Sequence, residues 1–212
     1  MDTLAQIANA VITGDDERVE ELTRQLIGGA TPPASILDDG LIAGMNVVGE
    51  RFKHHEIFLP DVLLAAKAMY AGMDLLKPLL VEAGIPSMGR VVMGTVRGDL
   101  HDIGKNLVSI MLQGAGIEVI DLGRDVSPEQ LVEAANAHDA PVIGMSALLT
   151  TTMPVMREVV ERIDKEGLTG KVKTIVGGAP VNEAFAREIG ADAYGYDAAN
   201  AVDRVKQLLV KT

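Results

Sequence analysis

The sequence has 212 residues, 48% of them hydrophobic, which is enough apolar material for one large core or two small ones. Its formal net charge of -11 repels phosphate backbones and anionic lipid surfaces, so neither nucleic acid nor a membrane is expected as a partner. It has no cysteine, which excludes disulfides, thiolate metal sites and cysteine nucleophiles, and with no export signal or membrane-length apolar run it predicts a cytoplasmic protein.

The first part of the chain, residues 2 to about 82, carries apolar side chains at helical spacing and predicts four helices. The second helix is expected to begin at Asp15 and to end near Gly28, because acidic residues suit a first turn and glycine suits a C-terminus. The third is expected to run unbroken over residues 35–52, and the fourth to have Pro60 in its first turn. Short loops between four helices predict a four-helix bundle.

The segment AGIPSMG at residues 83–89 interrupts this pattern, and we place a boundary there between a helical domain, residues 1–86, and a second domain, residues 87–212. Beyond it, β-rich runs alternate with amphipathic stretches, which predicts an α/β domain with a parallel sheet covered on both faces. The strands are expected in RVVMGTV, IEVIDLG, PVIGMSA, VKTIVGG and ADAYGY, in the flavodoxin-like (Rossmann-like) order 2-1-3-4-5. Ligands bind such sheets at the carboxyl ends of the strands.

Three loops at this edge have unusual sequences: GDLHDIG at residues 98–104, SALLTTT at residues 146–152, and Gly-Gly-Ala at residues 177–179. In the first loop His101 lies between two aspartates, and a metal-binding imidazole commonly donates its second ring N–H to a carboxylate. The other histidines do not pair with it as a non-haem metal site would require. A single histidine suits a metal that is already held by a macrocycle.

Two nucleotide-binding patterns are close to this sequence without matching it. The segment from Gly98 to Asn106 resembles a phosphate-binding loop, but five residues separate its glycines and Asn106 stands where serine or threonine binds magnesium. A dinucleotide-binding fold has an acidic residue about 20 residues after its glycine-rich turn, and Asp121 lies near that position. The G-x-G-x-x-G pattern of that turn is absent.

The motifs instead resemble those of cobalamin-binding domains. D-L-H-D-I-G matches their D-x-H-x-x-G signature, Ser146-Ala147-Leu148 matches their S-x-L, and Gly177-Gly178 matches their G-G, in the same order. The first half, with GERFKHHEIFLPDVLLAAKAM, resembles the helical cap of cobalamin-dependent methionine synthase and of the small corrinoid proteins of methanogens and acetogens. The resemblance to corrinoid methyltransferase proteins therefore covers nearly the whole chain.

This resemblance implies roles for three residues. His101 would displace the cofactor's own dimethylbenzimidazole and become the lower axial ligand of cobalt. Asp99 would accept the second ring N–H of His101, and Thr152 would bond to Asp99 in turn. A carboxylate able to take up a proton would adjust the histidine's hold as the charge on cobalt changes.

Further cofactor contacts are implied in both halves of the chain. Ser146 and Thr150 would hydrogen-bond the buried base of the nucleotide tail, and Phe52 and Leu59, with Val62 nearby, would cover the upper face of the corrin. The linker at residues 83–89 would be the hinge that lets this cap move. The remaining expected contacts are Gly94, Gly98, Leu100, Asp102, Ile103, Gly104, Leu148, Gly177, Gly178, Ala179 and Ala198.

The implied function is that of a methyl carrier, the carrier subunit of a corrinoid-dependent methyltransferase system. A substrate-specific methyltransferase would load the cobalt, a second methyltransferase would pass the methyl to a thiol or tetrahydropterin, and a reductive activase would restore the cobalt. The alternative is a cobalamin-binding sensor or regulatory protein, although such proteins usually append a DNA-binding or signalling module. A third interpretation, the cobalamin subunit of a mutase, is disfavoured by the helical cap, which suits methyl chemistry.

Overall fold

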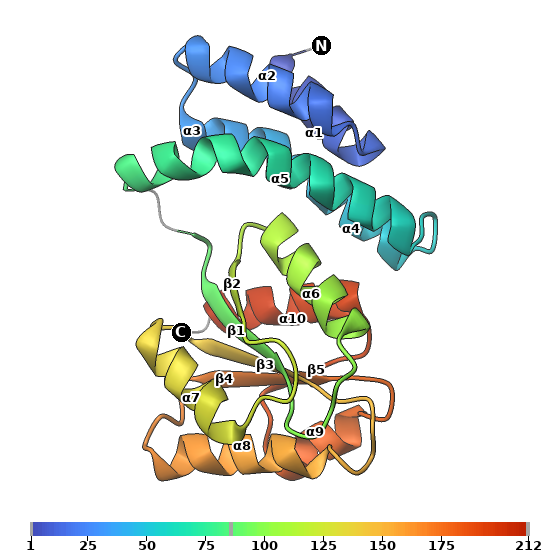
Figure 1. Ribbon diagram of the computed structural model, residues 1–212, viewed down its shortest axis with the longest axis vertical. Helices are drawn as coiled ribbons and strands as arrows, with labels where there is room; N and C mark the ends of the chain where they lie inside the picture. The colour runs from blue at the N-terminus through green and yellow to red at the C-terminus, as the bar shows by residue number, and fades with distance from the viewer. Residues whose placement is uncertain (1, 85–86, 211–212) are drawn as a thin grey trace. The chain divides into compact units, whose positions relative to one another are not determined.

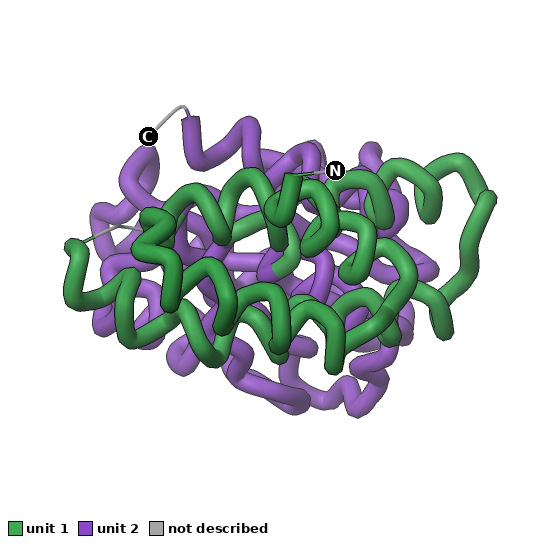
Figure 2. The backbone as a smooth tube through the Cα atoms, turned by 90° about the horizontal axis from the view of Figure 1, so that it is seen from above, with its two compact units in different colours: residues 1–87, 114–116 green, residues 88–113, 117–212 purple. Residues whose placement is uncertain are grey.

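The computed structural model describes residues 2–84 and 87–210 of the chain. The chain divides into two compact units, residues 1–87 with 114–116 and residues 88–113 with 117–212 (Figure 2). The hinge expected at residues 83–89 includes residues 85–86, which lie outside the described residues. None of the helices in the described part of the chain is long and apolar enough to cross a membrane.

The first unit is helical and is drawn in blue to teal in Figure 1. Asp15 accepts a hydrogen bond from the backbone N–H of Arg18 and so caps the second helix where the sequence predicts it to begin. The elements are α1 (Thr3–Thr13), α2 (Asp16–Gly28), α3 (Pro33–Ser35), the π-helix η1 (Ile36–Ile42), α4 (Ala43–Lys53) and α5 (Leu59–Glu82).

The unbroken third helix predicted for residues 35–52 is wrong in one respect, because a π-helical stretch lies within it. In this stretch the backbone N–H of Ala43 bonds to the carbonyl of Asp38, five residues back. Two glycines, one in this stretch and one just after it, face α1. A Cβ at Gly40 would lie 3.1 Å from Ile7, and one at Gly44 would lie 2.7 Å from the carbonyl oxygen of Ala8. The third helix therefore packs against α1 at a distance that only glycine permits.

The second unit is the α/β fold that the sequence predicts, with a parallel sheet in the confirmed order β2-β1-β3-β4-β5. Strands and helices alternate along the chain (Figure 1). They are β1 (Arg90–Thr95), α6 (Ile103–Gly114), β2 (Glu118–Asp121), α7 (Pro128–Ala137), β3 (Val142–Ser146), α8 (Pro154–Lys165), β4 (Lys173–Gly177), α9 (Glu183–Ile189), β5 (Ala193–Gly195) and α10 (Ala198–Val210).

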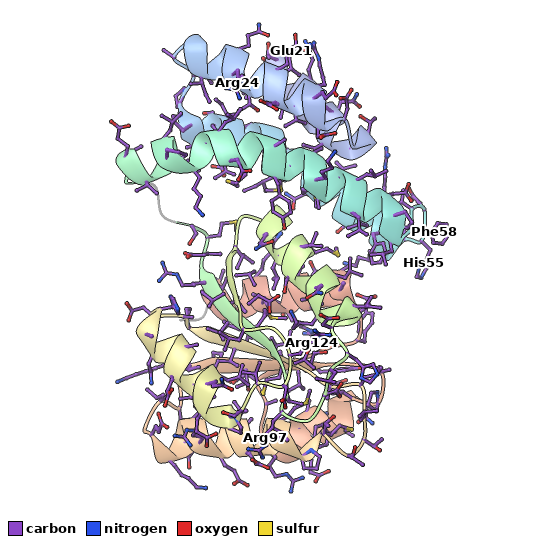
Figure 3. All side chains as sticks on the ribbon, viewed as in Figure 1. Glu21, Arg24, His55, Phe58, Arg97 and Arg124 are labelled. Carbon is purple, nitrogen blue, oxygen red and sulfur yellow. The ribbon has the colours of Figure 1, made fainter. Side chains whose placement is uncertain are left out.

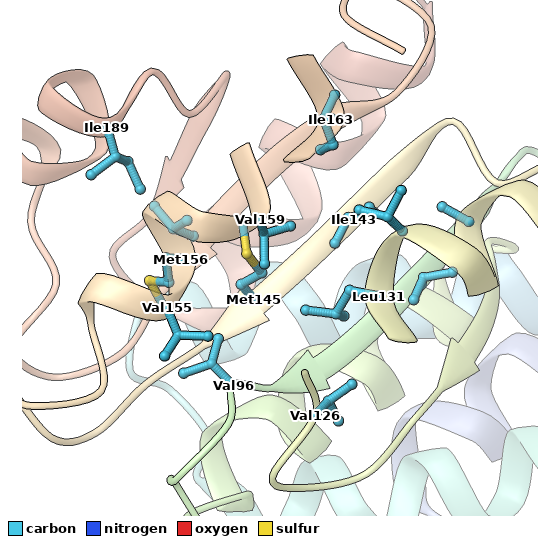
Figure 4. Close-up of a cluster of buried hydrophobic side chains, with 14 of the residues drawn as sticks. Val96, Val126, Leu131, Ile143, Met145, Val155, Met156, Val159, Ile163 and Ile189 are labelled. Atoms are coloured by element: carbon cyan, nitrogen blue, oxygen red, sulfur yellow. The ribbon is translucent and has the colours of Figure 1, made fainter. Parts of the chain in front are cut away.

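The two faces of this sheet differ in what covers them. Figure 1 shows α7, α8 and α9 on one face and α6 and α10 on the other. The first face carries a continuous hydrophobic core in which Leu131 of α7 and Val159 of α8 pack on Ile143 and Met145 of β3 (Figure 4). The second face carries small residues at its carboxyl end, namely Thr95, Ser146, Gly177 and Gly195.

Candidate functional site

The loops that follow β1 and β3 lie next to each other, because β1 and β3 are neighbours in the sheet. Thr95, the last residue of β1, pairs with Ser146, the last residue of β3, and the chain leaves the sheet directly after both. This is the point where the connections from adjacent strands diverge, and it brings residues 98–104 and residues 147–152 together.

Asp99 is the centre of the hydrogen bonds at this edge. Its Oδ1 accepts from the backbone N–H of His101 at 3.1 Å and from the ring Nδ1 of His101 at 2.7 Å. Its Oδ2 accepts from the backbone N–H groups of Leu148 and Leu149 at 2.7 and 3.1 Å and from the hydroxyl of Thr152 at 2.8 Å. One carboxylate therefore joins the loop after β1 to the loop after β3. The bonds from the His101 ring and the Thr152 hydroxyl are those that the resemblance implies.

These contacts decide the charge of Asp99. Burial of the side chain, which is 0% exposed, would by itself raise the pKa of the carboxyl. The hydrogen bonds from the His101 ring, the Leu148 backbone and the Thr152 hydroxyl outweigh burial and hold the pKa of Asp99 far below its ordinary value. Asp99 is therefore ionised at neutral pH. The expectation that Asp99 takes up a proton as the charge on a bound cobalt changes stays a prediction.

The ring of His101 is fixed on one side and open on the other. An ionised carboxylate can only accept, so Nδ1 carries the hydrogen in the bond to Asp99. In the neutral ring Nε2 then has a free lone pair, and it has no hydrogen-bond partner among the described residues. The side chain is 52% exposed, so this lone pair is available to a ligand.

The main chain around His101 is held by residues that the sequence analysis did not single out. The Thr95 hydroxyl donates to the carbonyl of His101 at 3.1 Å, and the Gly98 N–H donates to Oδ1 of Asp125 at 2.7 Å. Asp125 follows β2 and has a φ of 56°, which is uncommon outside glycine. The signal that could have drawn attention to it is its position at the same edge of the sheet as Asp99.

Exposed apolar side chains surround His101 in the sequence of this loop. Leu100 is 63% exposed and Ile103 is 75% exposed, and Leu148 of the facing loop is exposed as well. A Cβ at Gly104 would meet nothing within 4 Å. Asp102 is half-buried and lies 3.8 Å from the guanidinium of Arg124, which Figure 3 labels. The two loops therefore present exposed apolar side chains close to His101 in the sequence and in the facing loop.

A row of small residues crosses the sheet below these loops. Register pairs Thr95 with Ser146, Ser146 with Gly177, and Gly177 with Gly195, so all four project to the face that α10 covers. The next residue, Gly178, has a φ of 130°, and a Cβ there would overlap the carbonyl oxygen of Ala147. The other expected contacts near this row are Thr150 and Ala179, which are exposed, and Ala198, which is buried at the start of α10.

Gly94 needs a correction, because it projects to the opposite face. It pairs with Met145, and a Cβ at Gly94 would lie 3.0 Å from Leu131 and 3.3 Å from Val126, in the core under α7. It therefore does not border the row of small residues described above.

In the helical unit, the residues expected to cover a cofactor differ in exposure. Phe52 and Leu59 are half-buried, whereas Val62 is fully buried in α5 and belongs to the core of the bundle, so the expectation for Val62 is corrected. Phe58, which the sequence analysis passed over, is 67% exposed beside His55 in the loop between α4 and α5 (Figure 3). Its place two residues before Pro60, at the expected start of the fourth helix, was the available signal.

Comparisons with known proteins show what the chain is similar to. Two B12 binding domain families match the chain, one over residues 89–203 and the other over residues 3–77. The dimethylamine corrinoid protein 1 of Methanosarcina acetivorans is 48% identical over 207 residues, which cover 97% of each chain. The chain is also similar to a methanol:cobalamin methyltransferase complex from Methanosarcina barkeri, with a TM-score of 0.89, 33% identity, and coverage of 99% of this chain and 80% of that one.

A cobalamin-binding protein from Desulfitobacterium hafniense is similar over the whole chain, with a TM-score of 0.79, 34% identity and coverage of 98% of each chain. The family matches, taken together, span both units. The likeness to solved structures therefore includes the helical unit as well as the α/β unit. The chain belongs to the corrinoid proteins of the B12 binding family.

Proposed function

We propose that this protein carries a methyl group on the cobalt of a corrinoid, with His101 as the lower ligand of the metal. The observation that carries the proposal is the His101 ring, whose Nδ1 is fixed by a buried carboxylate and whose Nε2 is free and accessible. This is the arrangement in which a ligating imidazole is normally held. On this proposal residues 1–86 form a helical cap domain and residues 87–212 a cobalamin-binding domain.

The residues present fit such a cofactor. Among the described residues no group of three or more histidine, aspartate or glutamate side chains could chelate an ion, so His101 is suited to a metal that a macrocycle already holds. The exposed side chains of Leu100, Ile103 and Leu148 offer apolar surface for a large ring. In α6 the hydroxyl of Ser109 is buried without a hydrogen-bond partner, so a polar atom of a ligand tail would have a donor there.

The protein's own residues would bind, orient and shield. When bound, the corrinoid supplies the cobalt that accepts the methyl group and gives it up. Asp99 keeps the His101 ring in one tautomer and one orientation, and Thr152 with the Leu148 backbone keeps Asp99 ionised. The row Thr95, Ser146, Gly177 and Gly195 carries no large side chain, and we infer that a nucleotide tail would lie along it. Phe52 and Leu59 would exclude water from the upper face.

The partners follow from the chemistry of a carrier. We infer that one methyltransferase loads the methyl group, a second one passes it to a thiol or a tetrahydropterin, and a reductive activase restores the cobalt. Because the relative that is 48% identical is named a dimethylamine corrinoid protein, we propose a methylamine as the methyl donor.

A methyl-transfer assay tests this function. The purified protein, loaded with hydroxocobalamin and reduced, is incubated with a dimethylamine methyltransferase and dimethylamine, or with a methanol methyltransferase and methanol. We expect methylation of the corrinoid with the first pair, seen as a change in its visible spectrum. Methylation with the methanol pair alone would contradict the proposed donor, and methylation with neither pair would contradict the carrier function.

A further inference from the structure

Lys105 is a buried cation in the first turn of α6 that the contacts described above do not use. Its side chain is 1% exposed, and its Nζ donates to Oδ2 of Asp121 at 2.5 Å and to Oδ1 of Asn106 at 2.7 Å. Removing an ammonium from water is unfavourable, and the attraction to a carboxylate often only offsets that loss. Such a pair is therefore a weak source of stability, and it is better understood as a means of fixing one geometry.

The acceptor of this pair is itself fixed to the sheet. Asp121 is the last residue of β2, and its Oδ1 accepts from the backbone N–H of Gly123 at 2.8 Å. The carbonyl of Gly123 accepts in turn from the backbone N–H of Thr95 at 2.9 Å. Lys105 is thus connected through Asp121 and Gly123 to the end of β1, where the His101 loop begins.

The other end of the His101 loop depends on the turn that contains Lys105. α6 begins at Ile103, two residues after His101, and the backbone N–H of Asn106 donates to the carbonyl of Asp102 at 2.8 Å. The hydroxyl of Thr95 holds the carbonyl of His101 at 3.1 Å. The main chain at His101 therefore runs between an anchor on β1 and the first turn of α6, and Lys105 fixes that turn.

We propose that Lys105 and Asp121 are positioning residues, which set the place of the first turn of α6 and through it the place of the His101 ring relative to cobalt. This inference deepens the proposed function and rests on it for its consequence. Groups that support a metal ligand from outside typically change metal affinity by about 10–100-fold when they are removed. Neither residue would touch the cofactor.

The experiment compares Lys105→Met and Asp121→Asn with the wild-type protein. We expect hydroxocobalamin to bind at least about tenfold more weakly to Lys105→Met. In the reduced cobalt(II) form a smaller fraction should show histidine coordination by electron paramagnetic resonance. Asp121→Asn keeps an oxygen for Gly123 and should show the same changes to a smaller extent. In the cofactor-free protein the Asn106 amide should exchange its hydrogen faster in both variants.

Two controls separate positioning from general effects. Lys165→Met removes a lysine that is 76% exposed on α8 and should change nothing. Val159→Ala weakens the core on the other face of the sheet, and it should lower stability while leaving the histidine-coordinated fraction as in the wild type.

The inference would be overturned if both Lys105→Met and Asp121→Asn bound hydroxocobalamin with wild-type affinity, showed wild-type histidine coordination and left the exchange rate of the Asn106 amide unchanged. The inference would also be overturned if Val159→Ala and Lys105→Met were equally stable and lost histidine coordination to the same degree. Absence of histidine coordination in the wild type would instead refute the proposed function. The exchange rate at Asn106 would still decide whether Lys105 holds the turn.

Discussion

At the scale of single residues, the site depends on a carboxylate whose acceptor positions are filled. The two oxygens of Asp99 receive donors from His101, Leu148, Leu149 and Thr152, and the side chain is 0% exposed. A buried charge of this kind is tolerated only where hydrogen bonds replace the lost water. The same bonds determine which nitrogen of His101 remains free.

The Thr152 hydroxyl is the side-chain donor to Asp99 from the loop after β3, so its removal should be costly. Thr152→Val leaves a buried carboxylate with one bond fewer, and we expect the free energy of unfolding to fall by about 1–3 kcal/mol. Thr152→Ser keeps the hydroxyl and should lose much less. Urea unfolding of both variants measures the difference, and equal losses would show that the bond to Asp99 is not what matters.

The lowered pKa of Asp99 also makes stability depend on pH. The unfolded chain has an aspartate pKa of about 3.9, so the contribution of Asp99 is complete above that value and is lost as the pH falls toward its lower folded value. We expect the cofactor-free wild type to lose more stability on acidification below about pH 4 than Asp99→Asn does. Unfolding measured along a pH series gives the two slopes, and parallel slopes would contradict the ionised state of Asp99.

At the scale of elements, the π-helical stretch and the glycines facing α1 determine how the helical unit packs. A Cβ at Gly44 would lie 2.7 Å from the carbonyl oxygen of Ala8 and 2.8 Å from Val11. We expect Gly44→Ala to force the helices apart and to lower the free energy of unfolding by about 1–3 kcal/mol. Gly28→Ala is the matched control, because a Cβ at Gly28 would meet nothing within 4 Å. Thermal unfolding of both variants tests this, and an equal effect would contradict the close approach of α1.

The order of the elements in the α/β unit was predictable, because alternating strands and helices restrict a parallel sheet to few topologies. It was harder to predict from the sequence to which face of the sheet a given residue projects. All but the first residue of β1 are buried, so the strand has no polar alternation, and the sequence alone does not show that Gly94 faces α7.

The site was predictable where a side chain carries the interaction and less so where the backbone does. His101, Asp99 and Thr152 were found through a motif, and the structure brings them together. Asp99 also accepts from the backbone N–H groups of Leu148 and Leu149. Because nearly every residue type has a backbone N–H, the sequence does not indicate which of these groups act as donors. The π-helical stretch was missed for a related reason, since one widened turn leaves the apolar spacing nearly helical.

At the scale of the whole molecule, the two units are each matched by a B12 binding domain family. Binding to the folded protein alone should stabilise it by mass action, by about 2.7 kcal/mol at a ligand concentration 100 times the dissociation constant. We expect the Tm to rise steadily with the logarithm of the hydroxocobalamin concentration. His101→Ala should show a smaller rise at each concentration, and a Tm that does not respond in the wild type would contradict corrinoid binding.

The most direct test of the account is to identify the atom that binds cobalt from below. Protein labelled only at histidine with the heavy nitrogen isotope is loaded with cobalamin, reduced to the cobalt(II) form and examined by electron paramagnetic resonance. We predict that the nitrogen splitting of the wild type changes from a triplet to a doublet on labelling. In labelled His101→Ala the doublet should be absent. A triplet that persists in the labelled protein, or a doublet that persists in His101→Ala, would contradict ligation by His101.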